Sequence, residues 1–124
     1  MDELKNTYVW SYNGGEYPFD ISESESMKRM EVGLSALRER NEEIGVGGGE
    51  ALREQCMMIR EFFDTVLGEG MGSAVCGEAY SSSAHTMAYM EFILFVNAQV
   101  RAFREAVSAV EEKYRARAAG TCGA

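Results

Sequence analysis

Residues 90–117, MEFILFVNAQVRAFREAVSAVEEKYRAR, place apolar side chains at steps of three and four along the chain. This spacing puts them on one face of an α-helix and predicts a long final helix over residues 83–117. Its segment FILFV, residues 92–96, has apolar side chains on every side, so we expect burial on more than one side there. The whole repeat consists of Met87, Met90, Leu94, Asn97, Val100, Phe103, Val107, Val110 and Tyr114.

The predicted final helix is too long for a small domain to cover. At about 1.5 Å per residue, roughly 35 residues make a helix of about 52 Å, whereas a compact domain of this size is about 35 Å across. We therefore expect the helix either to be broken or to pack its end on another chain. The second half of the repeat is predicted to bind a protein partner through Val100, Phe103, Val107, Val110 and Tyr114.

An aromatic stretch near the start of the chain, YVWSYNGGEYPFDI (residues 8–21), predicts a β-hairpin over residues 7–22. An Asn-Gly pair between two alternating runs is the strongest short-range hairpin signal. Two registers fit: a turn at Asn13–Gly14 pairs Trp10 with Tyr17, and a turn one residue later pairs Trp10 with Phe19. In both registers the aromatic side chains share one face, which we expect to cover the helices.

The edge of this hairpin is a second candidate partner surface. Pro18 has no N–H to donate, so its strand is predicted to be an edge that does not extend the sheet. Any pairing with a neighbouring chain is then expected to use the first strand, with Tyr8 and Trp10 as candidate partner-binding residues.

Two further helices are predicted between the hairpin and the final helix. The first covers residues 23–44, from the capping serines of SESES to GVGGG at 45–49, a run that no helix interior tolerates. The second covers residues 50–67 and ends at GEGMG, before a short turn or loop. The sequence thus predicts a mainly α (α+β) fold, one domain over residues 1–124, in which the hairpin packs on a bundle of three main helices.

Helical spacing also predicts which side chains of these helices are buried. It assigns Met27, Met30 and Met90 to the core, and leaves Met58 and Met71 as candidate surface contacts, because methionine suits adaptable binding faces. The expected core face of helix 50–67 consists of Leu52, Cys56, Ile59, Phe63 and Val66.

The composition is that of a globular protein, with 46% hydrophobic residues and a formal net charge of −8 over 124 residues. The negative charge argues against a nucleic-acid binder, which needs clustered Lys and Arg, and against an anionic membrane surface. There is no apolar run long enough to span a bilayer, and three cysteines without close pairing fit a reducing compartment. We therefore expect a cytoplasmic protein with no nucleic-acid partner and no membrane partner.

The sequence offers little for catalysis or for ligand chemistry. Cys76 and the single histidine, His85, could form a nucleophile and base, but no acid is placed to orient either side chain. The three cysteines, with Cys56 and Cys122 far from Cys76, lack the spacing of a zinc site. GVGGGEALR lacks the lysine of a phosphate loop, and the acids of SESES and RNEEI lack the pattern of a calcium loop. We expect no enzyme activity, no metal and no cofactor.

The order of these motifs resembles a family of small prophage proteins from Gram-positive bacteria. In that family an aromatic NGxEY hairpin precedes an S-x-x-M-x-R-x-E helix, and a QC…FFD…GEG segment and an F-x-x-F-V-N helix follow. The segments that carry the resemblance are WSYNGGEYPFDISESESMKRMEVGLSAL, GEALREQCMMIREFFDTVLGEG and YMEFILFVNAQV. They cover about residues 8 to 100, while the Gly-rich loop at 45–49 and the short tail depart from the pattern.

The resemblance implies a gene position among phage tail-assembly genes, where small acidic helical proteins look like tail assembly chaperones. Such a chaperone holds the tape-measure protein soluble before the tail tube polymerises around it. We therefore expect a non-enzymatic homo-oligomer that binds a phage tail protein in the cytoplasm of the bacterial host. The alternatives are a structural tail-completion component of the virion and a small adaptor that binds a host protein.

Overall fold

The computed structural model describes residues 8–45 and 47–122, so residue 7, the first of the predicted hairpin, lies outside the described residues. Side chains are described up to residue 118. The predicted fold class, mainly α with an N-terminal two-stranded hairpin and a long last helix, is confirmed. The elements are β1 (Val9–Tyr12), β2 (Gly15–Pro18), α2 (Ser24–Glu43), α3 (Gly48–Leu67), α4 (Met71–Cys76) and α5 (Ser82–Cys122).

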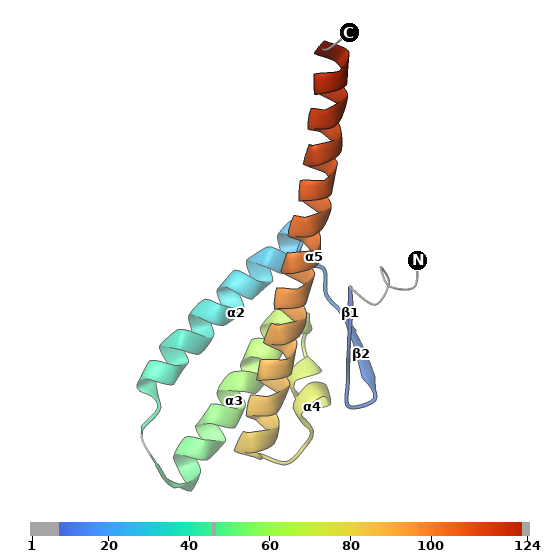
Figure 1. Ribbon diagram of the computed structural model, residues 1–124. Coiled ribbons are helices and arrows are strands. Elements are labelled where there is room, and N and C mark those ends of the chain that lie inside the picture. The colour runs from blue at the N-terminus through green and yellow to red at the C-terminus, as the bar shows by residue number, and fades with distance from the viewer. Residues whose placement is uncertain (1–7, 46, 123–124) are drawn as a thin grey trace.

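The molecule has two parts, which Figure 1 shows side on. The head contains β1, β2, α2, α3, α4 and residues 82–100 of α5, and its buried side chains form one core. The overhang is residues 101–118 of α5, in which every side chain is exposed. α5 is one continuous helix of 41 residues, so the alternative of a broken helix is wrong. Among the described helices, none is both long enough and apolar enough to cross a membrane.

The hairpin adopts the first of the two registers that the sequence allowed. Trp10 pairs with Tyr17, and the turn residues are Asn13 and Gly14. Both turn residues have positive φ, 47° and 79°, as the tight type I′ turn between twisted strands requires. The N–H of Phe19 continues the pairing past the strand by donating to the carbonyl of Tyr8 at 2.9 Å.

The aromatic face of the hairpin packs against α3 and α5. The ring of Trp10 stacks on Phe63 of α3 with 5.8 Å between centroids and meets Phe92 of α5 edge-on at 5.1 Å. Phe19, just after β2, also meets Phe92 edge-on at 5.4 Å. A two-stranded sheet is marginally stable by itself in water. These contacts therefore explain how the hairpin stays folded on the helices.

A buried side-chain amide on α5 also anchors the chain where it leaves the hairpin. Nε2 of Gln99 donates to the carbonyl of Phe19 at 2.7 Å, and Oε1 of Gln99 accepts a hydrogen bond from the N–H of Ile21. The amide satisfies both backbone groups as a neighbouring strand would. Gln99 thereby holds the start of the following segment against α5 at the base of the overhang.

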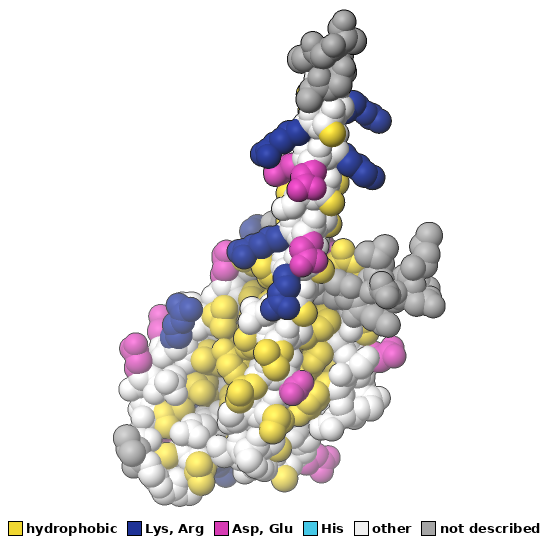
Figure 2. Space-filling view, viewed as in Figure 1, with side chains coloured by type: hydrophobic (Ala, Val, Ile, Leu, Met, Phe, Trp, Pro, Cys, Tyr) yellow, Lys and Arg dark blue, Asp and Glu magenta, His cyan; other side chains and the backbone are white. Residues whose placement is uncertain are grey.

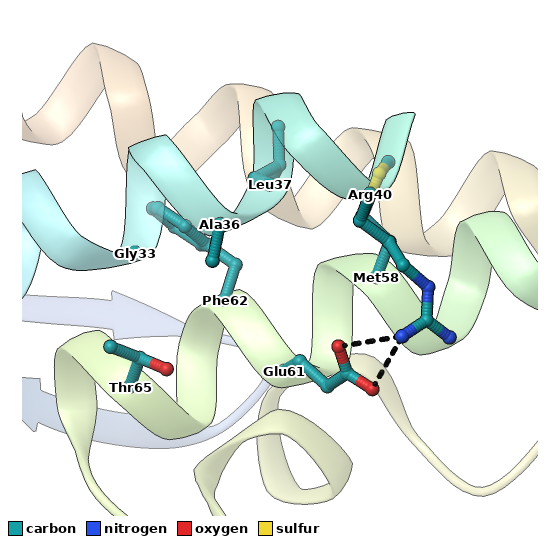
Figure 3. A pocket seen from close by; sticks show the side chains of 8 residues that line it. All are labelled: Gly33, Ala36, Leu37, Arg40, Met58, Glu61, Phe62 and Thr65. Carbon is teal, nitrogen blue, oxygen red and sulfur yellow. Dashed lines mark hydrogen bonds and ion pairs between the residues drawn. The ribbon is translucent and has the colours of Figure 1, made fainter. Parts of the chain in front are cut away.

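α2 packs on α3 with a close approach at Gly33 and a narrow groove that extends from Gly33 to Arg40 (Figure 3). A Cβ at Gly33 would lie 2.8 Å from Cγ2 of Val66, so the absence of a side chain there lets the helices meet. Toward the other end, Nη1 of Arg40 lies 3.3 Å from both carboxylate oxygens of Glu61. The groove has a volume of about 290 Å³ and is lined by Gly33, Ala36, Leu37, Arg40, Met58, Glu61, Phe62 and Thr65.

The predicted burial of the methionines is only partly right. Met30 is buried as expected, but Met27 and Met90 are exposed, so their assignment to the core is wrong. Met58 is buried between α3 and α2 and is not a surface contact, while Met71 is half-buried. A helix in a small domain buries a narrow face, and side chains at the margin of a periodic pattern can fall on either side of it.

The element boundaries differ from the prediction by a few residues. α3 begins at Gly48 instead of residue 50, and α5 extends to Cys122 instead of residue 117. The loop after residue 70 contains the short helix α4. Leu52, in the first turns of α3, is exposed, which corrects its assignment to the core, whereas the other four residues of the predicted core face are buried.

Candidate functional site

The buried face of α5 in the head differs from the face predicted by the repeat. It contains His85, Ala88, Phe92, Val96 and Gln99, which recur at steps of three and four. These side chains point toward α3, α4 and the hairpin, whose aromatic rings cover Phe92. The predicted residues Met87, Met90 and Leu94 belong to a different face of the same helix.

In the overhang the predicted repeat and the core face of α5 coincide. Steps of four, four, three and four residues lead from buried Gln99 to Phe103, Val107, Val110 and Tyr114. Their exposed fractions are 51% for Phe103, 41% for Val107, 65% for Val110 and 74% for Tyr114. We call these four side chains the overhang seam. It is the core face of α5 continued beyond the described residues that cover this face in the head.

A second apolar surface lies on the exposed face of α5 in the head. Met87 is 56% exposed, Met90 57% and Leu94 60%, and steps of three and four place them in one row. We call this row the head stripe. Figure 2 shows apolar side chains gathered over the head where α5 crosses it. Isolated exposed apolar residues are ordinary, whereas a continuous row of long side chains indicates an interaction surface.

The remaining candidate partner residues are Val100, Tyr8 and Trp10. Val100 is half-buried against the head core, and Tyr8 is exposed. Trp10 is buried between α3 and α5, so its assignment to a partner surface is wrong; the hairpin uses this ring for its own packing. A small cavity of about 100 Å³ is bounded by Tyr8, Asp20, Ile21, Ser22, Gln99, Ala102, Phe103 and Ala106.

A polar cluster that the sequence analysis missed joins α3 to the loop before α5. Nε of Arg60 donates to Nε2 of His85 at 2.9 Å, and Nη2 donates to the carbonyl of Gly77 at 2.6 Å and of Glu78 at 3.1 Å. The guanidinium also lies over the ring of Tyr80, with its carbon 4.4 Å from the centroid. Arg60 thus satisfies carbonyl groups of a loop that has few backbone partners of its own.

The same cluster determines the protonation of His85, which is fully buried. Because the guanidinium can only donate, Nε2 accepts, and the proton sits on Nδ1, which lies 2.7 Å from the carbonyl of Ser81. Burial lowers the pKa of His85 below 6.5, with a further lowering by the charge of Arg60 and an opposing effect of the Ser81 hydrogen bond. His85 is therefore a neutral side chain that accepts a hydrogen bond from Arg60 and donates one to Ser81.

The candidate nucleophile of the sequence analysis lies in an environment that suppresses its ionisation. Burial raises the pKa of the Cys76 thiol to about 11, against the opposing effect of Arg60. Nδ1 of His85 carries the proton, and the lone pair of Nε2 already accepts from Arg60, so no lone pair of the ring is placed to take a proton from this thiol. Across residues 8–45 and 47–122, no three His, Cys, Asp or Glu side chains gather as metal ligands. The side chain of Cys122 lies outside those described.

The neutral state of His85 leads to a pH prediction. Below pH 6.5 the unfolded chain binds a proton that the folded chain excludes, so the free energy of unfolding should fall as pH drops from 6.5 toward the lowered folded pKa. The loss is at most about 1.4 kcal/mol per pH unit. Urea unfolding at pH 7.5 and 5.5 measures it. His85→Gln should be less stable at pH 7.5 and show a smaller difference between the two pH values; an unchanged difference would contradict the assignment.

Comparison with protein families places the chain in a group defined by sequence. The model of a family of unknown function, DUF6673, matches residues 13–121. The chain belongs to this family. The matched residues run from the hairpin turn through the head and the overhang, so the overhang is part of what defines the family. Comparisons with curated proteins and with solved structures gave no match.

Proposed function

We propose that this chain is a non-enzymatic phage tail assembly factor, a chaperone-like protein that binds the tape-measure protein in the cytoplasm of the bacterial host. The observation that carries the proposal is that α5 exposes two apolar surfaces, the head stripe and the overhang seam. The phage context comes from the resemblance of the sequence to prophage proteins.

We assign the tape-measure protein to the head stripe. Met87, Met90 and Leu94 are long, flexible and more than half exposed, and methionine side chains adapt to differently shaped apolar partners. A tape-measure protein is long, so its chaperone must contact many segments without strict shape requirements. The net charge of −8 helps to keep a complex that contains exposed apolar segments in solution.

Co-expression with the tape-measure protein of the same prophage tests the proposal. The soluble fraction of the tape-measure protein should rise when the wild-type chain is present. Met90→Glu/Leu94→Glu should weaken binding about tenfold or more, because each glutamate replaces an apolar contact with a charge that must be desolvated. The matched control is Val32→Glu/Leu52→Glu, which adds the same charge at two exposed apolar positions on α2 and α3.

Three results would contradict the proposal in different ways. If Met90→Glu/Leu94→Glu and the control variant solubilised the tape-measure protein equally well, the head stripe would not be the binding surface. Finding the chain in mature particles by mass spectrometry would favour a structural tail-completion component, because a chaperone leaves before maturation. Recovery of a host protein in place of the tape-measure protein would favour an adaptor.

A further inference from the structure

We infer that the overhang seam is covered by the overhang of a second copy of this chain, with the two α5 helices antiparallel. The inference does not rest on the proposed function, since it concerns the seam and not the head stripe. It starts from the observation that every side chain from residue 101 to 118 is exposed while the apolar face continues without interruption from the head core.

A second copy suits this surface because the seam is present in every copy. In a two-fold arrangement the same face meets itself, so one apolar row supplies both sides of the interface. The steps of three and four between Phe103, Val107, Val110 and Tyr114 are those of a coiled-coil seam, in which apolar side chains of two helices interlock. Figure 1 shows this part of α5 standing clear of the head, open to such a helix.

The antiparallel orientation pairs the seam side chains by size. With the two-fold axis between residues 108 and 109, Val107 lies opposite Val110 of the second copy, and Phe103 lies opposite Tyr114. Both pairs occur twice by symmetry, so two aromatic pairs flank a central group of four valines. In the parallel orientation each of these side chains would instead meet its own counterpart.

The charges beside the seam favour the same orientation. In this antiparallel register Arg104 lies opposite Glu111 of the second copy, again twice, while Lys113 lies over Ala106 and can cover it with its methylene groups. In the parallel register the flanking contacts are Ala106 with Glu111 and Lys113 with Ala118, and neither is a pair of opposite charges.

The distribution of charge over the whole chain agrees with this arrangement. The overhang carries five Lys or Arg and three Glu, a net charge of +2, which leaves −10 on the rest of the chain. Antiparallel packing brings the basic end of each α5 toward the acidic head of the other copy, whereas parallel packing places the two basic ends together.

A small cavity lies at the base of the seam. The cavity of about 100 Å³ beside Phe103 is bounded by Tyr8, Ile21 and other side chains, at the level where Tyr114 of the second copy would arrive. Tyr114 is the most exposed seam residue, at 74%.

The experiment is sedimentation equilibrium of the full chain with a charge exchange across the seam. The wild-type chain should be a dimer. Arg104→Glu and Glu111→Arg should each raise the dimer Kd about tenfold, because each places like charges opposite one another twice. The double variant Arg104→Glu/Glu111→Arg should restore the wild-type Kd. Matched controls are Arg101→Glu and Glu112→Arg, which make the same charge changes away from the seam and should leave the Kd unchanged.

Val107→Glu/Val110→Glu should give a monomer whose head remains folded by circular dichroism, since both side chains are exposed. A wild-type monomer, or a dimer that survives this double change, would overturn the use of the seam. Failure of the charge exchange to restore the Kd would overturn the antiparallel register. Met90→Glu/Leu94→Glu should stay dimeric, so loss of tape-measure binding and loss of dimerisation are measured on separate variants.

Discussion

Phe92→Ala is expected to lower the free energy of unfolding by about 3–5 kcal/mol. The side chain is 0% exposed, and its ring lies 5.1 Å from Trp10, 5.4 Å from Phe19 and 5.6 Å from Phe63 between centroids. Its removal leaves a cavity where the hairpin, α3 and α5 meet, and it also removes edge-on ring contacts worth about 0.5–1.5 kcal/mol each. Urea unfolding followed by the fluorescence of Trp10, the single tryptophan, measures the effect.

The control lies two residues further along the same helix. Leu94 is 60% exposed, so Leu94→Ala should change the free energy of unfolding by about 0.5 kcal/mol or less. If Phe92→Ala does not fold, Phe92→Leu replaces it as the test variant. It should lower the free energy of unfolding by a smaller, measurable amount at the same position. Equal effects of Phe92→Ala and Leu94→Ala would mean that the buried face of α5 is assigned wrongly.

The hairpin could be predicted from the sequence because its signal is local. Asn13 and Gly14 supply the positive φ of the turn, and the alternation of aromatic residues identifies the covered face. The register stayed open because a turn at Asn13–Gly14 and a turn one residue later both place the aromatic side chains on the same face of the hairpin. Contacts with distant residues, the pairing of Phe19 with Tyr8 and the amide of Gln99 on α5, accompany the observed choice.

For α5 the periodicity predicted a long helix but assigned the wrong face to the core in the head. FILFV has apolar side chains all round, so the steps of three and four can be followed through Met90 and Leu94 or through Phe92 and Val96. The structure buries the second pair, because the aromatic rings of α3 and of the hairpin meet α5 there. Partners that lie far apart in the sequence decided this face.

The candidate surfaces differ in how well the sequence could reveal them. The overhang seam was predictable because none of the residues that the structure describes covers Val107 or Val110, so the repeat alone defines their face. The head stripe was missed because it appears only once the buried face is known. The contact between Arg60 and His85 joins residues 25 apart through an arginine that periodicity does not distinguish from a solvated one.

Gly72→Ala is expected to lower the free energy of unfolding by about 2–3 kcal/mol. A Cβ at this position would lie 2.3 Å from the backbone oxygen of Arg60 and 2.8 Å from its Cα. These are backbone atoms in the middle of α3, so they cannot rotate away, and α4 would have to move. That movement would stretch the 2.7 Å hydrogen bond from the N–H of Gly72 to Oδ1 of Asp64. Urea unfolding midpoints of the wild-type chain and of Gly72→Ala measure the loss in the free energy of unfolding.

Two other glycines make this prediction a graded series, because they differ in what a new Cβ would meet. At Gly33 the nearest atom is Cγ2 of Val66, a side-chain atom that can shift, so Gly33→Ala should cost less than Gly72→Ala. At Gly49 nothing lies within 4 Å, and alanine there should be neutral or stabilise α3 by about 0.4–1 kcal/mol. If Gly72→Ala behaved like Gly49→Ala, α4 would not be packed on the backbone of Arg60. Arg60 also binds the loop that directly follows α4, through the carbonyls of Gly77 and Glu78. If α4 lay elsewhere, this loop would have to lie elsewhere too, and its contacts with Arg60 would not form.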